Sequence, residues 1–262
     1  MIQYSRSLLL TFILFCTAGC GSCTTADERI YNEAQSLWLQ NKFSDAIPKL
    51  MVIVERSKDP YLVTKSLVRL GEIYYLNYQE PERAIEFYQR AVQIGGSDHL
   101  TLKANIDIAQ IYFLVMKNYD ASILQYNKII NEFPDLISEE KYRFKIAEAY
   151  FAKGNYPQAE IEFYNILKEF PDTKLRPDIL YQIGNGYYIN GHTEKAVELF
   201  LQVVKEYPDS RYEFDSWLSI AISYEEQEKL EESFKIYQML DEKFPAEGII
   251  LKKIESVKKR ID

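Results

Sequence analysis

The chain has 262 residues, of which 47% are hydrophobic and 27% charged, so it has ample apolar material for a folded core and is not mainly disordered. Its formal net charge of −8 argues against a surface whose main role is to bind phosphates, because nucleic-acid-binding proteins usually carry a basic patch. All three cysteines lie within the first 23 residues, so the remainder has no disulfide, thiol nucleophile or cysteine-based zinc site.

The N-terminus has the pattern of a secretory signal peptide. Residues 1–7 carry one positive charge and no acid, and an almost unbroken apolar run follows from Leu8 to Ala18. This run is too short to cross a bilayer core of about 30 Å as a helix. A basic start, a short apolar stretch and small residues together are typical of a cleaved secretory signal.

The end of this segment resembles the signal of bacterial lipoproteins, in which two small residues precede a cysteine that is lipidated. Here Gly19 precedes Cys20, although Thr17 stands where the family usually has Leu. The resemblance implies a signal peptide over 1–19 and lipidation of Cys20, with several acyl chains holding the protein on a membrane. Two alternatives remain open: Cys23 as the modified residue, or an ordinary secreted protein in which Cys20 has no role.

The same resemblance predicts where the protein is located. In enterobacterial lipoproteins an Asp after the lipidated cysteine signals retention in the inner membrane, and here that residue is Gly21. We therefore expect the bacterial outer membrane, with the folded body facing the periplasm. Residues 20–26 would form a short tether that keeps the body close to the bilayer.

The rest of the chain is an internal repeat of about 37 residues. Four prolines lie 37 residues apart, each preceded by an aromatic residue, and this length accommodates two helices and two turns. A small residue recurs in step, followed four residues later by a large apolar residue, which places both on one helix face. The prolines are Pro134, Pro171, Pro208 and Pro245, and the small residues are Ala46, Ala84, Ser122, Ala159, Ala196 and Ser233.

A second helical pattern precedes each of these helices. Its hallmark is Ala or Gly followed three residues later by a large residue, usually Tyr. The small residue would let two antiparallel helices approach closely, and the large one would fill the space beside them. Gly154-Asn155 and Asn190-Gly191 mark turns between paired helices. The hallmark residues are Ala34, Gly71, Ala109, Ala147, Gly184 and Ala221.

These motifs resemble the tetratricopeptide repeat. Leu70-Gly71-x-x-Tyr74 matches the first part of that repeat, and Ala196, Phe200 and Pro208 match the second. The resemblance implies an all-α solenoid, a right-handed superhelix of six helix-turn-helix pairs over residues 27–246. The expected units are about 27–60, 64–98, 102–135, 140–173, 177–210 and 214–246.

Residues 248–261 form one more amphipathic stretch, which we expect to be a helix that caps the last apolar face of the array. Its lysines could contact a membrane or a partner, but a solvated outer face is the simpler interpretation.

The resemblance also predicts a binding groove. In this family the first-helix position after the packing aromatic, and the position seven residues earlier, face the concave groove where peptides bind. Exposed apolar residues of this kind are typical of partner-binding surfaces. The alternative is that they only pack between neighbouring pairs. The first column is Trp38, Tyr75, Phe113, Phe151 and Tyr188, with Glu225 in the sixth unit, and the second is Tyr31, Val68, Ile106, Phe144, Tyr181 and Leu218. A clamp for a partner's terminal carboxylate is not expected, because the equivalent positions we compared in the fourth and fifth units are mostly apolar or otherwise unsuited.

No pattern in the sequence predicts catalysis or a cofactor. His99 and His192 fall at expected turns without a second His or Cys to complete a metal set. There is no phosphate-binding loop and no nucleophile elbow. The acidic run from Glu225 to Glu232 could attract a basic partner, but such runs are usually solvated. We expect a non-enzymatic protein without metal, cofactor, small-molecule substrate or nucleic-acid partner.

Two further resemblances suggest an envelope function. Ile30-Tyr31-x-x-Ala34-Gln35 with the following Phe43-x-x-Ala46 resembles the start of the BamD family, lipoproteins of the machinery that inserts β-barrels into the outer membrane. Residues 207–212 resemble connections found in BamD and in CpoB, a protein associated with Tol-Pal. BamD usually has five repeats, whereas six are expected here, as in some pilotins that help secretins assemble. We expect a BamD-like role, with a pilotin or Tol-Pal scaffold as the alternative. An accessory to a peptidoglycan-processing enzyme is a further alternative, although no stretch of the sequence would supply a catalytic domain.

Overall fold

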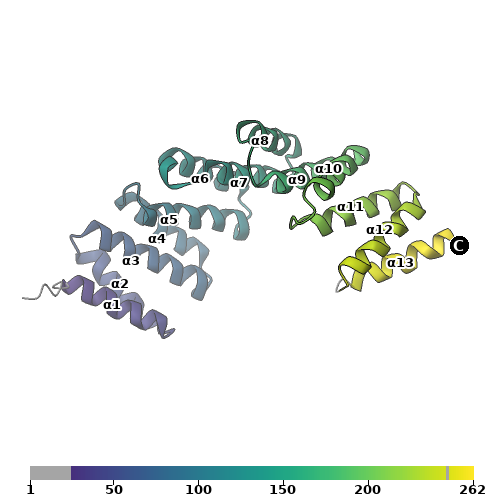
Figure 1. Ribbon diagram of the computed structural model, residues 1–262. Helices are drawn as coiled ribbons and strands as arrows, with labels where there is room; N and C mark the ends of the chain where they lie inside the picture. Colours follow the sequence, from purple (N-terminus) through teal and green to yellow (C-terminus); the bar gives the residue numbers. More distant parts are fainter. Residues whose placement is uncertain (1–24, 246–247) are drawn as a thin grey trace, which may run out of the picture.

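The computed structural model describes residues 25–245 and 248–262, and within these ranges the chain forms thirteen α-helices and no strand (Figure 1). The predicted signal peptide, Cys20 and Cys23 lie outside the described residues. The all-helical solenoid expected from the sequence is confirmed: twelve helices form six consecutive pairs, and a thirteenth follows them.

We call the first helix of each pair the A helix and the second the B helix. The A helices are α1 (Ala26–Leu39), α3 (Pro60–Glu72), α5 (His99–Gln110), α7 (Glu139–Ala152), α9 (Arg176–Ile189) and α11 (Glu213–Glu226). The B helices are α2 (Phe43–Arg56), α4 (Pro81–Ile94), α6 (Tyr119–Glu132), α8 (Tyr156–Glu169), α10 (Thr193–Glu206) and α12 (Leu230–Lys243). The last helix is α13 (Gly248–Ile261).

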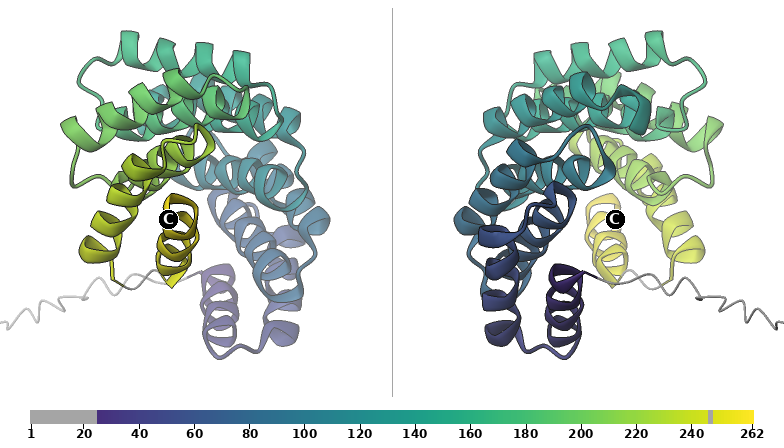
Figure 2. Two further views of the ribbon diagram at one scale, coloured as in Figure 1. Left: turned by 90° about the vertical axis from the view of Figure 1, so that its right-hand side faces the viewer. Right: turned by 90° about the vertical axis from the view of Figure 1, so that its left-hand side faces the viewer.

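The pairs follow one another along a curved array. In Figure 1 they run from α1 (purple) to α13 (yellow), and α8 lies outside α7 and α9, so here a B helix forms the outer side. The two views turned by 90° show the helices arranged around an arch (Figure 2). The array is therefore curved, with α1 at one end and α13 at the other.

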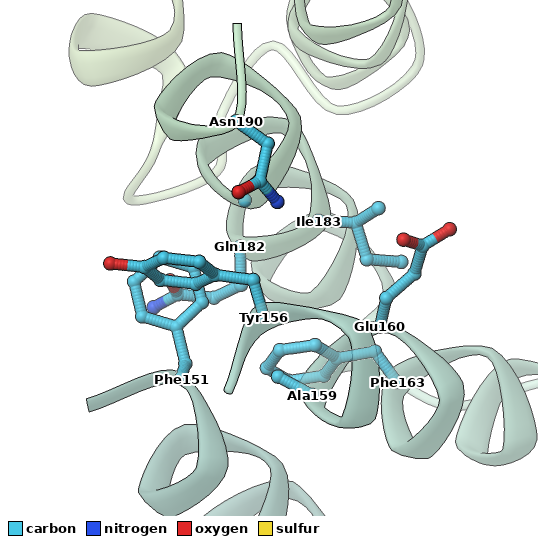
Figure 3. Close-up of a pocket in the computed structure, with 9 residues that line it drawn as sticks. Phe151, Tyr156, Ala159, Glu160, Phe163, Gln182, Ile183 and Asn190 are labelled. Atoms are coloured by element: carbon cyan, nitrogen blue, oxygen red, sulfur yellow. The ribbon is translucent and has the colours of Figure 1, made fainter. Parts of the chain in front are cut away.

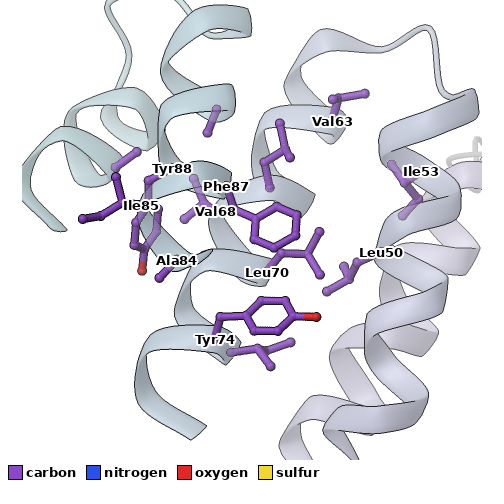
Figure 4. Packing of buried hydrophobic residues seen from close by; sticks show 14 of the residues in the cluster. Leu50, Ile53, Val63, Val68, Leu70, Tyr74, Ala84, Ile85, Phe87 and Tyr88 are labelled. Atoms are coloured by element: carbon purple, nitrogen blue, oxygen red, sulfur yellow. The ribbon is translucent and has the colours of Figure 1, made fainter. Parts of the chain in front are cut away.

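Close approach within a pair depends on the small hallmark residue of the A helix. A Cβ atom added to Gly71 would lie 2.5 Å from Cε1 of Tyr88, and one added to Gly184 would lie 2.7 Å from Cε1 of Phe200. Both rings are fully buried, and Tyr88 lies in the packed core shown in Figure 4. The glycine thus allows close approach of the two helices, as expected, but the ring packed against it belongs to the B helix and is not the large residue three positions after the glycine.

Two units contain one extra residue, which the chain accommodates as a π-helical turn. Ala196 lies 12 positions after Gly184, whereas Ala84 lies 13 positions after Gly71, and the third unit has the same longer spacing. The π-helices η1 (Ile73–Tyr78) and η2 (Ile111–Val115) lie at the ends of α3 and α5, within these two longer intervals. A single inserted residue typically produces such a wide turn, and π-turns are frequent at functional sites.

The turn between the A and B helices contains one residue with positive φ in every unit. Only two of the six are glycines, at φ of 83° and 78°, and the others are held between 52° and 59°. A left-handed backbone costs a non-glycine residue about 1–2 kcal/mol, so four of these turns store strain. The six residues are Asn41, Gln79, Lys117, Gly154, Gly191 and Glu228.

The core is divided along the array into five clusters of buried side chains. The first extends from α1 to η2, and the others follow over α5–α7, α7–α9, α9–α11 and α11–α13. In the last cluster Ile250 and Val257 of α13 are completely buried against α11 and α12. The capping helix therefore covers the apolar face of the sixth pair, as a repeat array requires at its end.

Candidate binding surface

One face of the A helices carries a regular column of exposed aliphatic side chains. Five residues along an α-helix correspond to a rotation of about 140°, so in the units whose A helix is α-helical throughout, the residue five positions after the hallmark Ala or Gly points away from the paired B helix. Four large side chains at this position are 68%, 64%, 53% and 51% exposed, and the fifth, an alanine, is exposed as well. We call Leu39, Leu76, Leu114, Ala152 and Ile189 the aliphatic column.

The π-turns widen the apolar surface at the second and third units. Leu76 and Leu114 both lie within π-helices, and Tyr78 and Val115 beside them are also exposed. Monomeric proteins rarely expose contiguous apolar surface without a functional reason, and a periodic column is more informative than a single exposed leucine. The A-helix face is accordingly the candidate interaction surface.

The first column expected from the sequence lies beside the aliphatic column but is half-buried. The guanidinium of Arg69 covers the ring of Trp38 at 3.9 Å from the centroid, and Phe151 packs edge-on against Tyr156 at 5.0 Å between centroids. Phe113 makes the same edge-on contact with the first residue of the following B helix. These rings therefore contribute both to the surface and to packing.

Tyr188 of the first column is hydrogen-bonded across to the next unit. Its hydroxyl donates to Glu226 Oε1 at 2.6 Å. Burial and this hydrogen bond raise the pKa of Tyr188 to about 12, so the phenol stays protonated at neutral pH. Glu226 occupies the position of the aliphatic column in the sixth unit, and the column therefore ends at Ile189.

The second expected column is more deeply placed. Tyr31, Val68 and Phe144 are buried, whereas Ile106, Tyr181 and Leu218 are half-buried. Tyr181 stacks on Tyr212 at 4.3 Å between centroids, with an interplanar angle of 16°. Phe144, one of the buried members, packs against Phe163 of the same pair at 5.4 Å between ring centroids. Partner binding by either column stays a prediction.

Gly186 leaves a small hollow between the fourth and fifth pairs. Phe151, Tyr156, Gln182 and Asn190 are among the residues that line it (Figure 3). The hollow encloses about 10 Å³, which is room for at most about one water molecule. It is too small to bind an organic ligand.

The two histidines considered in the sequence analysis both lie at the start of a helix. His192 precedes α10 at its N-cap position, and His99 is the first residue of α5 rather than part of a turn. In the described part of the chain, no three His, Cys, Asp or Glu side chains form a group that could hold a metal ion.

None of the helices in that part has the length and apolar character needed to span a membrane.

The aliphatic column was not singled out from the sequence, although a signal for it was present. Its five members directly follow the first expected column in the chain, and all five are apolar. A residue next to a packing aromatic is expected to be polar where it faces water. An apolar residue at the same register position in five successive units was therefore a signal of an exposed apolar surface.

Two family models, both describing the tetratricopeptide repeat, match most of the chain. One matches residues 31–99, and the other matches 106–136, 142–173, 178–210 and 215–246. Repeats of this kind typically form scaffolds that bind other proteins, and neither model describes an enzyme family. No curated protein matches the sequence.

Solved structures share the fold at low sequence identity. The C-terminal part of a TPR repeat-containing protein from Cytophaga hutchinsonii is 18% identical, with a TM-score of 0.58 over 81% of this chain and 78% of its own. PilW, described as a type IV pilus biogenesis factor, is 12% identical, with a TM-score of 0.57 over 87% of this chain and 98% of its own. YrrB, described as a TPR protein with an unusual peptide-binding site, is 15% identical, with a TM-score of 0.50 over 78% and 96%. The repeated helix pairs, the matching family models and these structures together show that the chain belongs to the tetratricopeptide repeat family.

Proposed function

We propose that this protein is a non-catalytic, lipid-anchored scaffold on the periplasmic face of the outer membrane, where it binds protein partners through the A-helix face. The observation that carries the binding role is the aliphatic column, four of whose side chains are at least half exposed in register from unit to unit. Burying such side chains against a partner is favourable at about 25 cal/mol per Å² of apolar surface removed from water.

The leader sequence supports the membrane anchor. Cys20 follows two small residues after an apolar run, and α1 begins only six positions later, at Ala26. A protein anchored at Cys20 would therefore hold its first helix pair close to the lipid surface. The A-helix face would then be available to partners in or near the same membrane.

Within this role we favour a BamD-like function in the assembly of outer-membrane β-barrels. The support is local: the start of α1 and α2 resembles the start of that family, and residues 207–212 resemble one of its inter-repeat connections. Both segments lie in a lipoprotein-like chain of tetratricopeptide repeats, which is the architecture that the family has.

The second candidate is a scaffold for secretin or pilus assembly, or for Tol-Pal. Its support is the presence of six helix pairs followed by α13, one pair more than BamD usually has. PilW shares this fold over almost its whole length, although at 12% identity the likeness concerns the fold alone.

Gentle detergent extraction of a C-terminally tagged protein from its native envelope, followed by mass spectrometry, tests the proposal. Recovery of the large barrel-insertase subunit would support the BamD-like role. Recovery of a secretin, a pilus-assembly protein or Tol-Pal components without the insertase would overturn that role in favour of the second candidate. A Cys20→Ser variant provides the control for the anchor, and its persistence in the membrane fraction would contradict lipidation at this residue.

A further inference from the structure

The last helix, α13, lies in the register of an A helix. Counting on by the 37-residue repeat from the sixth unit, Ile220 corresponds to Val257 and the hallmark Ala221 corresponds to Lys258. Ile220 and Val257 are both completely buried, so α13 packs on the sixth pair with the face that an A helix uses. The described chain has no helix after α13 in the place of a B helix (Figure 1). In the described residues, α13 is therefore an A helix without its partner.

An apolar stripe on α13 is open where the other A helices are covered. Ile261 stands at the packing position three residues after the hallmark. Its counterparts in all six pairs are buried or half-buried, whereas Ile261 is 40% exposed and Leu251 is 53% exposed. Intervals of three and four residues place both on one helix face with Ile254 and Lys258. We call Leu251, Ile254, Lys258 and Ile261 the α13 stripe.

The charged residues of α13 fall into two groups. Lys253 and Arg260 contact Glu225 of α11, so they belong to the attachment of α13 to the sixth pair. The second group is exposed, and no ion pair joins its members to each other or to another described residue. It consists of three cations and two carboxylates, Lys252, Lys258, Lys259, Glu255 and Asp262. A surface that complements this group must itself carry both signs of charge, as a second copy of α13 does.

We propose that the α13 stripe is a homodimer interface, in which α13 packs antiparallel on α13 of a second copy. When Leu251 lies opposite Ile261 of the second copy, Lys258 lies opposite Ile254 and beside Glu255 of that copy. The twofold symmetry repeats this contact, which gives two ion pairs between the chains. A parallel pairing would instead place the two Lys258 side chains opposite each other. Charge complementarity therefore favours the antiparallel direction.

The size of the contact predicts a reversible dimer. α13 has 14 residues, which corresponds to a length of about 21 Å. Stable interfaces bury about 1,600 Å² in total, and two helices of this length packed along one stripe bury less. The aliphatic contacts provide the favourable free energy, and the ion pairs determine direction and partner choice. We therefore expect association that depends on protein concentration.

Sedimentation equilibrium of the full chain, in a mild detergent matched to the density of the solvent, tests the proposal without a tag next to α13. The average mass of the wild-type protein should rise from that of a monomer towards that of a dimer between about 1 and 100 μM. High salt should weaken the association, because the two ion pairs lie at the exposed edge of the stripe.

Charge-exchange variants assign the association to the stripe. Lys258→Glu places a carboxylate beside Glu255 of the second copy, and Glu255→Lys places an ammonium beside Lys258. Each variant alone should dimerise at least about tenfold more weakly than the wild type, since like charges then face each other twice. An equimolar mixture of the two should associate as the wild type does, because every contact again joins opposite charges. The double variant Glu255→Lys/Lys258→Glu should also dimerise.

Glu232→Lys and Lys235→Glu are the matched controls. They make the same exchanges at the same three-residue spacing on exposed positions of α12, and both should keep the wild-type association. All four positions are exposed, so circular dichroism and melting curves are expected to stay those of the wild type.

Three results would overturn the proposal. The wild-type mass could stay that of a monomer throughout the concentration range, either α13 variant could associate as strongly as the wild type, or the mixture of the two could remain monomeric. These measurements use no partner protein. Failure of the dimer interface is therefore distinguishable from failure of the proposed function, which depends on what co-purifies from the envelope.

Discussion

The carboxylate of Glu225 lies 2.9 Å from the guanidinium of Arg260, and this contact ties α11 to the capping helix α13. Lys253 of α13 contacts the same carboxylate at 3.0 Å, and the Tyr237 hydroxyl of α12 donates to it at 3.0 Å. Glu225 occupies the position where the other five units have an aromatic residue. Glu225 replaces the aromatic residue in the sixth unit because its carboxylate binds two cationic side chains of α13.

Acidification should loosen this attachment. Burial raises the pKa of Glu225, but Lys253, Tyr237 and Arg260 together lower it more, so it lies below its ordinary value of 4.5 in the folded protein. A lowered pKa contributes stability that is present above the unfolded-state pKa and is lost as pH falls through the folded-state pKa. Glu225→Gln should therefore cost about 1–2 kcal/mol at pH 7, with a smaller difference from wild type at acidic pH.

Chemical denaturation at a series of pH values measures this effect. Glu86→Gln, at an exposed position of α4, is the matched control and should behave like the wild type. Identical unfolding of the two variants at pH 7 would show that the contacts of Glu225 with α13 contribute no stability.

Gly71→Ala should destabilise the protein by about 1–2 kcal/mol. The new Cβ would approach the buried ring of Tyr88 to 2.5 Å, and the cost of overpacking exceeds the gain of up to about 1 kcal/mol in helix propensity. Gly96→Ala is the control, since an added Cβ there meets nothing within 4 Å. Thermal melts of both variants give the comparison, and an unchanged Gly71→Ala protein would mean that the ring can move aside.

Replacing two leucines of the aliphatic column should weaken partner capture without unfolding the protein. Leu76→Ser with Leu114→Ser removes exposed apolar area, so we expect at least a tenfold loss of partner recovered in the extraction experiment and little change in the melting temperature. Leu124→Ser with Ile161→Ser, at exposed positions of α6 and α8, is the control for surface hydrophobicity. Equal losses in both double variants would argue against a role specific to the A-helix face.

Glycine at two of the strained turns should stabilise the array. Gln79 and Lys117 have φ of 57° and 52°, which glycine adopts without the Cβ penalty. After the entropic cost of glycine, each substitution should add about 0.5–1 kcal/mol, measured by chemical denaturation. Lys153→Gly, at the last-turn end of α7 where φ is ordinary, should be neutral or destabilising, and a gain there of the same size would remove the explanation by strain.

The positions of the small residues within each unit, and the spacing between them, could be predicted from the sequence. The close approach of paired helices at the small residues was predicted, and the contact of Gly71 with Tyr88 agrees with it, but the sequence did not identify Tyr88 as the ring that packs there. The extra residue in two units was also visible in the sequence, because the small residues there lie 13 rather than 12 positions apart. The spacing alone does not say whether this residue lengthens the loop or forms a π-turn in the helix.

Other features required the three-dimensional contacts. Ser122 and Ser233 replace the usual alanine, and their hydroxyls donate to the carbonyl oxygens of Ala109 and Ala221 at 3.1 and 2.9 Å. The sequence indicated only that these residues are small. Likewise, the depth of the two expected columns depends on how far each unit is rotated against the next, and this rotation follows from packing along the whole array rather than from any single repeat.

The division of the core into five clusters has a consequence for damage to the chain. Because each pair shares its buried side chains only with its neighbours, a proteolytic cut or a misfolded unit should fray the adjoining pairs and leave distant ones intact. The A-helix face would then become shorter rather than disappear, and a protein that had lost its last units could still present the first ones to a partner.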